Sequence, residues 1–200
     1  MKNEDLINNG FCVVDDVLPN DLALSIYEIF DNNPNWDTIH QKRHNRYSEE
    51  TVYQSTTFPQ KNEVYSTKFN KSVFLEQNQI IKSAFKEHFI PLLEEYSPFK
   101  MNEYDYRCYK LDWGDHYRIH TDGYAGVVNL IYYVNKDWRW DWGGILNVLS
   151  NDDPNYCESI FPKFNRVVLL NNKTFSSPHF VSSVENWAIN PRYSIVSFNK

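Results

Sequence analysis

The chain has 200 residues, 42% hydrophobic and 16% aromatic, which is enough apolar material for one packed domain. Its net charge of −6 argues against a nucleic-acid partner, because the chain has no surplus of basic residues to neutralise phosphates. Three widely spaced cysteines, Cys12, Cys108 and Cys157, indicate reduced thiols and not a disulfide framework. The N-terminus lacks the apolar stretch of a signal peptide, and no run reaches membrane-spanning length. We therefore expect a cytoplasmic protein with no membrane partner.

The first hundred residues are predicted to be mainly helical. An apolar run at 11–18 suits a strand, and residues 19–30 place apolar side chains at helical spacing. A second helix is expected around 72–96, where Pro91 should end or kink it.

The segment 36–70 is polar, charged and rich in tyrosine, with no sustained period. A compact domain rarely contains roughly thirty residues without secondary structure unless they form a lid, a binding loop or a solvated surface loop. Two readings stay open: a solvated loop, or a lid over the mouth of a site that orders when substrate binds. In the lid hypothesis the contacts come from Arg43, Arg46, Tyr47 and Tyr53.

From residue 102 the sequence changes to short aromatic and β-branched runs separated by Gly, Asn, Asp and Pro. Such runs, with no long helical pattern between them, are typical of an antiparallel sandwich or jelly roll. We predict a single domain over 1–200, with helical support in 1–100, where the lid of the second reading would also lie, and a β core with the metal site in 101–200. The expected strands are 103–111, 115–120, 126–134, 144–149, 157–161, 165–170, 178–184 and 192–199.

The stretch "YRIHTDG" places His120 and Asp122 two positions apart on an extended segment, where both point to one face. Such a pair is either a polar edge strand or two ligands of a metal. A third ligand is available from His116 on the same strand or from His179 at the start of a late strand. We favour His179, because two histidines and Asp122 on one short segment would crowd a single ion. Two histidines and one carboxylate on one face leave three positions open, as in non-haem Fe(II) oxygenases.

A basic residue near the C-terminus adds a second element of a site. Arg192 begins the predicted strand "RYSIVSF", and Ser194 shares its face. A buried arginine needs an anionic partner, since an unpaired charge in a core is costly. A dicarboxylic cosubstrate would provide a carboxylate for the planar guanidinium. The alternative is an arginine exposed at a strand edge.

Residues 109–200 resemble the core of the Fe(II)/2-oxoglutarate-dependent oxygenases, and within them the prolyl hydroxylases, including the EGL-nine type. The resemblance implies a mainly β fold with N-terminal helices and a double-stranded β-helix (jelly-roll, cupin-like) core. It also implies Fe(II), 2-oxoglutarate as cosubstrate, O2, and ascorbate as reductant. The matching pieces, in order, are "CYKLDWGDHYRIHTD", "LIYYVNKDWRWDWGGILNV", "FPKFNRVVLLNN", "SPHFV" and "RYSIVSF".

The same resemblance implies roles for individual residues. His120, Asp122 and His179 match the iron ligands. Arg192 matches the residue that binds the distal carboxylate of 2-oxoglutarate, and Tyr133 matches a tyrosine that assists it by a hydrogen bond. Tyr109 and Leu146 match residues that line the cosubstrate pocket. Strand alternation adds Ile131, on the face of Tyr133, and Ser194, on the face of Arg192.

The implied reaction hydroxylates an unactivated C–H bond and releases succinate and CO2. The implied substrate is a prolyl residue of a peptide or protein, or a proline-like small molecule. Two alternatives are the same chemistry on another free amino acid or small molecule, and a non-catalytic ligand-binding barrel. The loop after Asp122 is shorter than in the EGL-nine type, the interval from His179 to Arg192 is longer than in close relatives, and 36–70 has no clear counterpart. The prime substrate therefore does not transfer from the family.

The connection between the predicted strands 126–134 and 144–149 contains two adjacent glycines and three tryptophans. Gly143 and Gly144 predict a tight backbone turn before the second of these strands. The alternating Trp138, Trp140 and Trp142 either cover the mouth of the site or pack in the core.

Overall fold

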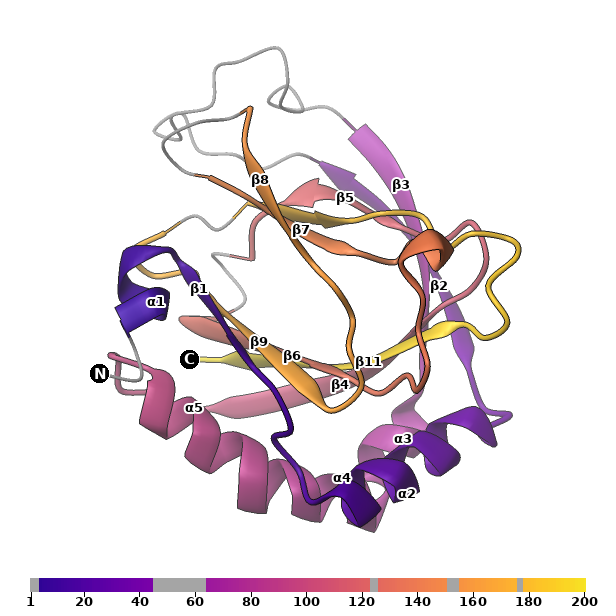
Figure 1. Cartoon of the computed structure of the whole chain (residues 1–200), viewed down its shortest axis with the longest axis horizontal. Helices are drawn as coiled ribbons and strands as arrows, with labels where there is room; N and C mark the ends of the chain where they lie inside the picture. Colours follow the sequence, from indigo (N-terminus) through magenta and orange to yellow (C-terminus); the bar gives the residue numbers. More distant parts are fainter. Residues whose placement is uncertain (1–3, 45–63, 123–125, 151–154, 176–177) are drawn as a thin grey trace.

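The computed structural model describes two antiparallel sheets that face each other (Figure 1). It describes residues 4–44, 64–122, 126–150, 155–175 and 178–200, with only the backbone for 41–44 and 64–67. The strands are β1 (Phe11–Val14), β2 (Asp37–His44), β3 (Val64–Lys71), β4 (Tyr104–Leu111), β5 (Tyr117–His120), β6 (Val128–Tyr133), β7 (Leu146–Leu149), β8 (Cys157–Ile160), β9 (Arg166–Asn171), β10 (His179–Val181) and β11 (Arg192–Asn199).

The larger sheet has the order β1-β9-β6-β11-β4-β3-β2, and the smaller has the order β5-β10-β7-β8. From β4 onward the chain passes repeatedly from one sheet to the other. Strands β4, β6, β9 and β11 enter the larger sheet, while β5, β7, β8 and β10 enter the smaller. This alternation is a double-stranded β-helix, so the predicted jelly-roll core is confirmed. All eight strands predicted after residue 102 are present.

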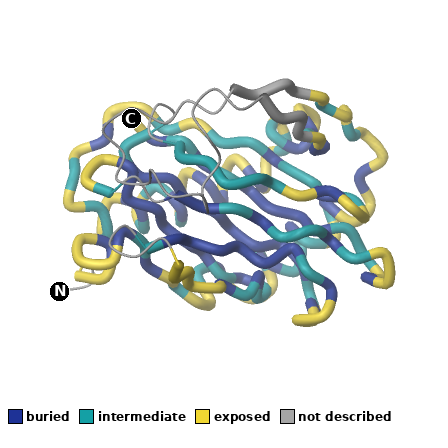
Figure 2. The backbone as a smooth tube through the Cα atoms, turned by 90° about the horizontal axis from the view of Figure 1, so that it is seen from above, coloured by how far each residue is buried: buried dark blue, intermediate teal, exposed yellow. Residues whose placement is uncertain are grey.

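The helices pack against the outer face of the larger sheet (Figure 1). Side chains of β6 alternate between two cores: Leu130 and Tyr132 pack with the helices, while Ile131 and Tyr133 face the interior between the sheets. Figure 2 shows buried residues running through the middle of the molecule, with exposed residues mainly at its turns. The helices are α1 (Glu4–Asn8), α2 (Asn20–Asp31), α3 (Val73–Gln77), α4 (Gln79–Ala84) and α5 (Ile90–Tyr96), with a π-helical turn at Phe85–Phe89 and a 3-10 turn at Trp140–Trp142.

The helix predicted around 72–96 is divided into shorter pieces. Asn78 lies between α3 and α4, and its side chain accepts hydrogen bonds from the backbone N–H groups of Ile80 and Ile81. An asparagine in this position starts a new helix and does not continue the old one. Pro91 lies in the first turn of α5, directly after the π-helical turn, where its missing N–H costs least.

The expectation that 36–70 lacks secondary structure was wrong at both ends of the segment. Strand β2 pairs with β3, and Asn70 and Lys71 of β3 pair with β4, so the two strands extend the larger sheet. The two strands contain few apolar residues. Two of these, Ile39 and Phe69, are register partners and have mostly polar neighbours. Alternation between polar and apolar residues is therefore too weak to predict these strands from sequence. The lid contacts predicted for Arg46, Tyr47 and Tyr53 lie outside the described residues, as does the side chain of Arg43.

Two further predictions concern the cysteines and membrane spans. Cys12, Cys108 and Cys157 are free thiols, as expected, and the first two are buried. Burial raises the pKa of Cys12 to about 12, so this thiol stays protonated. Among the described residues, no helix is long and apolar enough to cross a membrane.

Candidate metal and cosubstrate site

His120 and His179 come together at one end of the smaller sheet. His120 ends β5 and His179 begins β10, and the two residues are register partners in this antiparallel pair. Opposite residues in such a pair point to the same face, so both imidazoles face the larger sheet. Their ring centroids are 4.3 Å apart, and His179 is buried.

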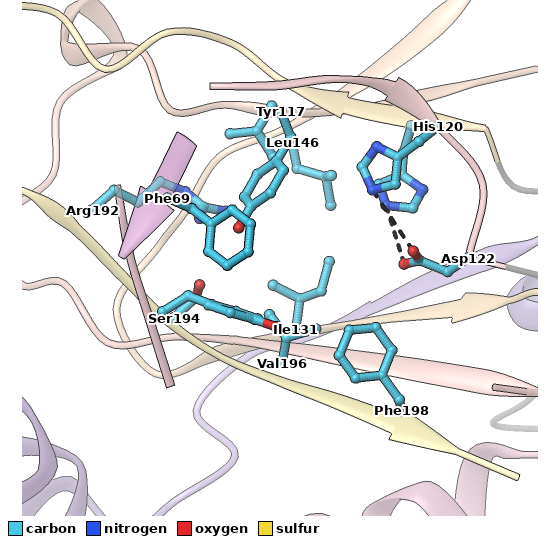
Figure 3. A pocket seen from close by; sticks show the side chains of 13 residues that line it. Phe69, Tyr117, His120, Asp122, Ile131, Leu146, Arg192, Ser194, Val196 and Phe198 are labelled. Carbon is cyan, nitrogen blue, oxygen red and sulfur yellow. Dashed lines mark ion pairs between the residues drawn. The ribbon is translucent and has the colours of Figure 1, made fainter. Parts of the chain in front are cut away.

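Asp122 completes a group of three possible metal ligands (Figure 3). Its Oδ1 lies 3.8 Å from Nε2 of His120, and its Oδ2 lies 3.5 Å from Nε2 of His179. Among the described residues this is the one group of three such side chains close enough to share an ion. His116, the competing third ligand, is exposed, and its Nδ1 lies near the backbone oxygen of Gly114 instead. The structure therefore favours His179, as the sequence did.

The chemistry of this donor set suits a divalent transition metal. Nδ1 of His120 lies 2.7 Å from the backbone oxygen of Arg118, an acceptor that fixes the proton on Nδ1. The lone pair of Nε2 is then directed toward Asp122 and His179. Two imidazoles and a carboxylate on one side of an ion leave its other side open to the pocket. We conclude that these residues fit Fe(II).

A pocket of about 590 Å³, its open mouth included, extends from these three residues between the sheets. Eight of the nine site residues predicted from the sequence line it. They are Tyr109, His120, Asp122, Ile131, Leu146, His179, Arg192 and Ser194. The triad and Arg192 lie at opposite sides of the pocket, with apolar and aromatic side chains between them (Figure 3). The pocket thus offers metal ligands at one side and a cation at the other.

Arg192 is the buried cation of this pocket. Its side chain is 3% exposed, and its Nε has no hydrogen-bond partner among the described residues. From the sequence, Trp138 could lie at the mouth of the site or in the core. The structure places it in the core cluster between the sheets, close to Gly144 and Arg192. Gly143 and Gly144 both have positive φ, which confirms the predicted tight turn. An unpaired buried guanidinium is costly, so this end of the pocket favours an anionic ligand.

Tyr133 differs from the other predicted site residues because it does not line the pocket directly. It is fully buried, and its ring lies under the guanidinium of Arg192, 5.0 Å from ring centroid to Cζ. Its hydroxyl has no hydrogen-bond partner among the described residues. Burial raises the pKa of Tyr133, and the charge of Arg192 opposes part of the rise. The hydroxyl therefore keeps its proton and can donate it in a hydrogen bond.

Five lining residues were missed from the sequence. Val196 and Phe198 follow Arg192 and Ser194 at a spacing of two on β11, and Val181 follows His179 in the same way on β10. Strand alternation alone would have found these three. The others are Tyr117 of β5 and Phe69 of β3.

The match to a protein family covers the part of the chain that forms this site. Residues 104–200 match the model described as the 2OG-Fe(II) oxygenase superfamily. These residues belong to that superfamily. The enzyme is a 2-oxoglutarate-dependent dioxygenase, and its superfamily uses Fe(II), 2-oxoglutarate and O2. No curated protein sequence is significantly similar to this oxygenase.

Solved structures share the fold of the whole oxygenase. A prolyl hydroxylase from Trichoplax adhaerens, in complex with a hypoxia-inducible-factor peptide fragment, is 17% identical with a TM-score of 0.66, over 100% of this chain and 87% of that one. A prolyl-4-hydroxylase from Pseudomonas putida is 14% identical with a TM-score of 0.62, over 98% and 95%. The non-haem epimerase SnoN from nogalamycin biosynthesis is 11% identical with a TM-score of 0.58, over 96% and 78%. At these identities the likeness shows the fold, and prime substrates differ among the neighbours.

Proposed function

We propose that this oxygenase hydroxylates an unactivated C–H bond of a prolyl residue or a proline-like substrate, with release of succinate and CO2. The proposal is supported by the likeness of the fold to prolyl hydroxylases over nearly the whole chain. The oxygenase chemistry itself follows from the superfamily.

In this proposal His120, Asp122 and His179 bind Fe(II), and Arg192 binds the distal carboxylate of 2-oxoglutarate. The observation that supports it most directly is the buried guanidinium of Arg192, with an unpaired Nε, across the pocket from the triad. Bound Fe(II) and 2-oxoglutarate would serve to activate O2, which is the oxidant: one oxygen atom would enter the C–H bond, and the other would leave in succinate as CO2 is released. The protein's share is to bind, to orient and to exclude water.

The remaining predicted residues complete the binding of the cosubstrate. The protonated hydroxyl of Tyr133, next to Arg192, would donate a hydrogen bond to the same carboxylate. Ser194 follows Arg192 on the same face of β11 and adds a second hydroxyl at that side of the pocket. Tyr109, Leu146 and Ile131, which line the pocket, would form walls that separate the cosubstrate from water.

Succinate formation tests the proposal. The protein, loaded with Fe(II) under nitrogen, is given 2-oxoglutarate, ascorbate and O2 with proline-containing peptides, free proline or other free amino acids. We expect succinate to rise in step with a hydroxylated product for a prolyl substrate. Stoichiometric hydroxylation of a different amino acid, with none of proline, would support the small-molecule alternative. Absence of turnover with Fe(II) bound would support the non-catalytic barrel.

A further inference from the structure

Asn129 connects the larger sheet to the carboxylate of Asp122. Asn129 lies on β6 with none of its surface exposed, paired in register with Phe198 of β11 and Leu170 of β9. Its Nδ2 donates a hydrogen bond of 2.9 Å to Oδ2 of Asp122. The two histidines belong to the smaller sheet, so Asn129 is a contact to the triad from the opposite side of the barrel.

The orientation of the Asn129 amide follows from its partner. An ionised carboxylate can only accept hydrogen bonds, so the NH₂ group faces Asp122 and Oδ1 points away. This Oδ1 is buried and has no hydrogen-bond partner among the described residues. A buried acceptor without a partner lowers stability, and an apolar residue of similar size would avoid that cost. Stability alone therefore does not explain an asparagine at this position.

The backbone of Gly126 lies between the amide of Asn129 and the backbone of Asn199. A Cβ added to Gly126 would lie 2.7 Å from Oδ1 of Asn129 and 2.7 Å from the backbone N and O of Asn199. The backbone of Gly126 thus passes directly over the amide, which only a residue without a side chain permits. Asn199 is itself fixed by a hydrogen bond from its Nδ2 to the backbone oxygen of Val128 and by one from Ser197 to its Oδ1. The amide of Asn129 is thus enclosed on one side by the backbone of Gly126 and bound on the other by Asp122.

We propose that Asn129 is a positioning residue that fixes the carboxylate of Asp122 in the orientation required for metal binding. The proposal rests on the metal site of the preceding section and adds a residue outside its ligand set. Asp122 follows the end of β5, outside the strand ladder, and its side chain has two rotatable bonds. A hydrogen bond from a rigid strand removes that freedom before the metal arrives, so less entropy is lost on binding.

The test measures the affinity of the whole protein for Mn(II), which occupies such sites without O2 chemistry. Asn129→Leu removes the donor and keeps the side-chain size. We expect its dissociation constant for Mn(II) to rise about 10- to 100-fold, the usual effect of losing a partner of a metal ligand. The metal-free variant should unfold at a temperature equal to or above that of the parent, because the unpaired Oδ1 is also removed. Once saturated with Mn(II), it should bind 2-oxoglutarate within about threefold of the parent.

Asn147→Leu is the matched control. Asn147 is also a buried asparagine on a strand, but its hydrogen bonds go to Ile145 and Ser159. It should keep the parent's affinity for Mn(II). Gly126→Ala, which pushes against the amide from its other side, should weaken Mn(II) binding as Asn129→Leu does.

Mn(II) affinity within about threefold of the parent in Asn129→Leu would overturn the proposal, as would an equal loss in Asn147→Leu. Loss of 2-oxoglutarate binding by the Mn(II)-saturated variant would also overturn it, because the whole pocket would then be disturbed. If Asn129→Leu does not fold, Asn129→Ala decides by the same criteria. His179→Ala tests the proposed metal site separately from the role of Asn129. If His179→Ala keeps the parent's affinity for Mn(II), the metal site itself is wrong. If His179→Ala loses Mn(II) binding while Asn129→Leu keeps it, only the role of Asn129 is rejected.

Discussion

His120 and His179 are direct register partners in the pairing of β5 with β10, and their ring centroids are 4.3 Å apart. The hydrogen bonds of the smaller sheet therefore set the distance between the two imidazoles. Asp122 reaches the same point from the segment after β5 and is bound from the larger sheet by Asn129. The ligand group thus depends on both sheets being in place.

Removing either histidine should abolish metal binding. In the parent, Fe(II) or Mn(II) at about 100 times its dissociation constant should stabilise the fold by about 2.7 kcal/mol. His120→Ala and His179→Ala should lose this stabilisation, together with decarboxylation of 2-oxoglutarate. Thermal unfolding with and without Mn(II) measures the first effect. His116→Ala, an exposed histidine four residues from His120, is the control and should behave as the parent. A full metal-induced shift in both triad variants would contradict the assignment.

Arg192→Met should separate stability from cosubstrate binding. Losing one member of a buried charged pair costs about 2–5 kcal/mol. The concentration of 2-oxoglutarate needed for half-maximal turnover should therefore rise by about 1.5 to 3.5 decades, since about 1.4 kcal/mol corresponds to a factor of ten. In the absence of cosubstrate the variant should be as stable as the parent or more so, because an apolar side chain replaces an unpaired charge. Titration of 2-oxoglutarate and denaturant unfolding measure the two effects.

Arg139→Ala is the control for Arg192→Met, because Arg139 is exposed and paired with Asp141. It should leave the 2-oxoglutarate requirement unchanged. An unchanged requirement in Arg192→Met would mean that another cation binds the distal carboxylate. Lys110 and Arg166, two other cations of the larger sheet, form ion pairs with Asp112 and Asp15.

Gly144→Ala should disturb Arg192 through a single contact. A Cβ on Gly144 would lie 2.8 Å from Cδ of Arg192, and the φ of Gly144 is +64°. Gly114 also has a positive φ, +82°, but a Cβ there would have no neighbour within 4 Å. Both alanine variants should lose about 1–2 kcal/mol of stability from the backbone conformation. Only Gly144→Ala should weaken 2-oxoglutarate binding, and equal affinities in the two variants would rule out the contact as the cause.

Asp15→Asn should lower stability in a way that depends on pH. The hydrogen bond from Arg166, aided by Lys163, lowers the pKa of Asp15 to about 2. Because the pKa is lower in the folded state, the stabilisation is fully present above about pH 4 and declines as the pH falls toward 2. The partly exposed pair should contribute about 1 kcal/mol or less. Urea unfolding at pH 7, 4 and 3 should show a shrinking difference between parent and variant, and a constant difference would refute this account.

Sequence periodicity predicted the barrel strands because the inner faces of those strands are apolar and alternate regularly, whereas the roles of Arg192, Tyr133, Tyr109 and Leu146 came from the resemblance to the oxygenase family. Alternation along the strand assigned Ile131 and Tyr133 to one face, and the same alternation places Asn129 on that face. The contact of Asn129 with Asp122 was not predictable, since it depends on where the chain places Asp122 after leaving β5. Strands β2 and β3 were missed because they have few apolar residues and gain their order from pairing with β4. Phe69, which lies on β3, was therefore not predicted as a pocket residue.

Strand β11 lies between β4 and β6 in the middle of the larger sheet and pairs with both along its length. Strands β6 and β4 can pair with β9 and β3 without it, but the two halves of the larger sheet are joined only through residues 192–199. Pairings between such distant parts of a chain form slowly. Arg192 begins this same strand, so the pairing that joins the two halves of the sheet also brings the proposed ligand of the distal carboxylate into the pocket.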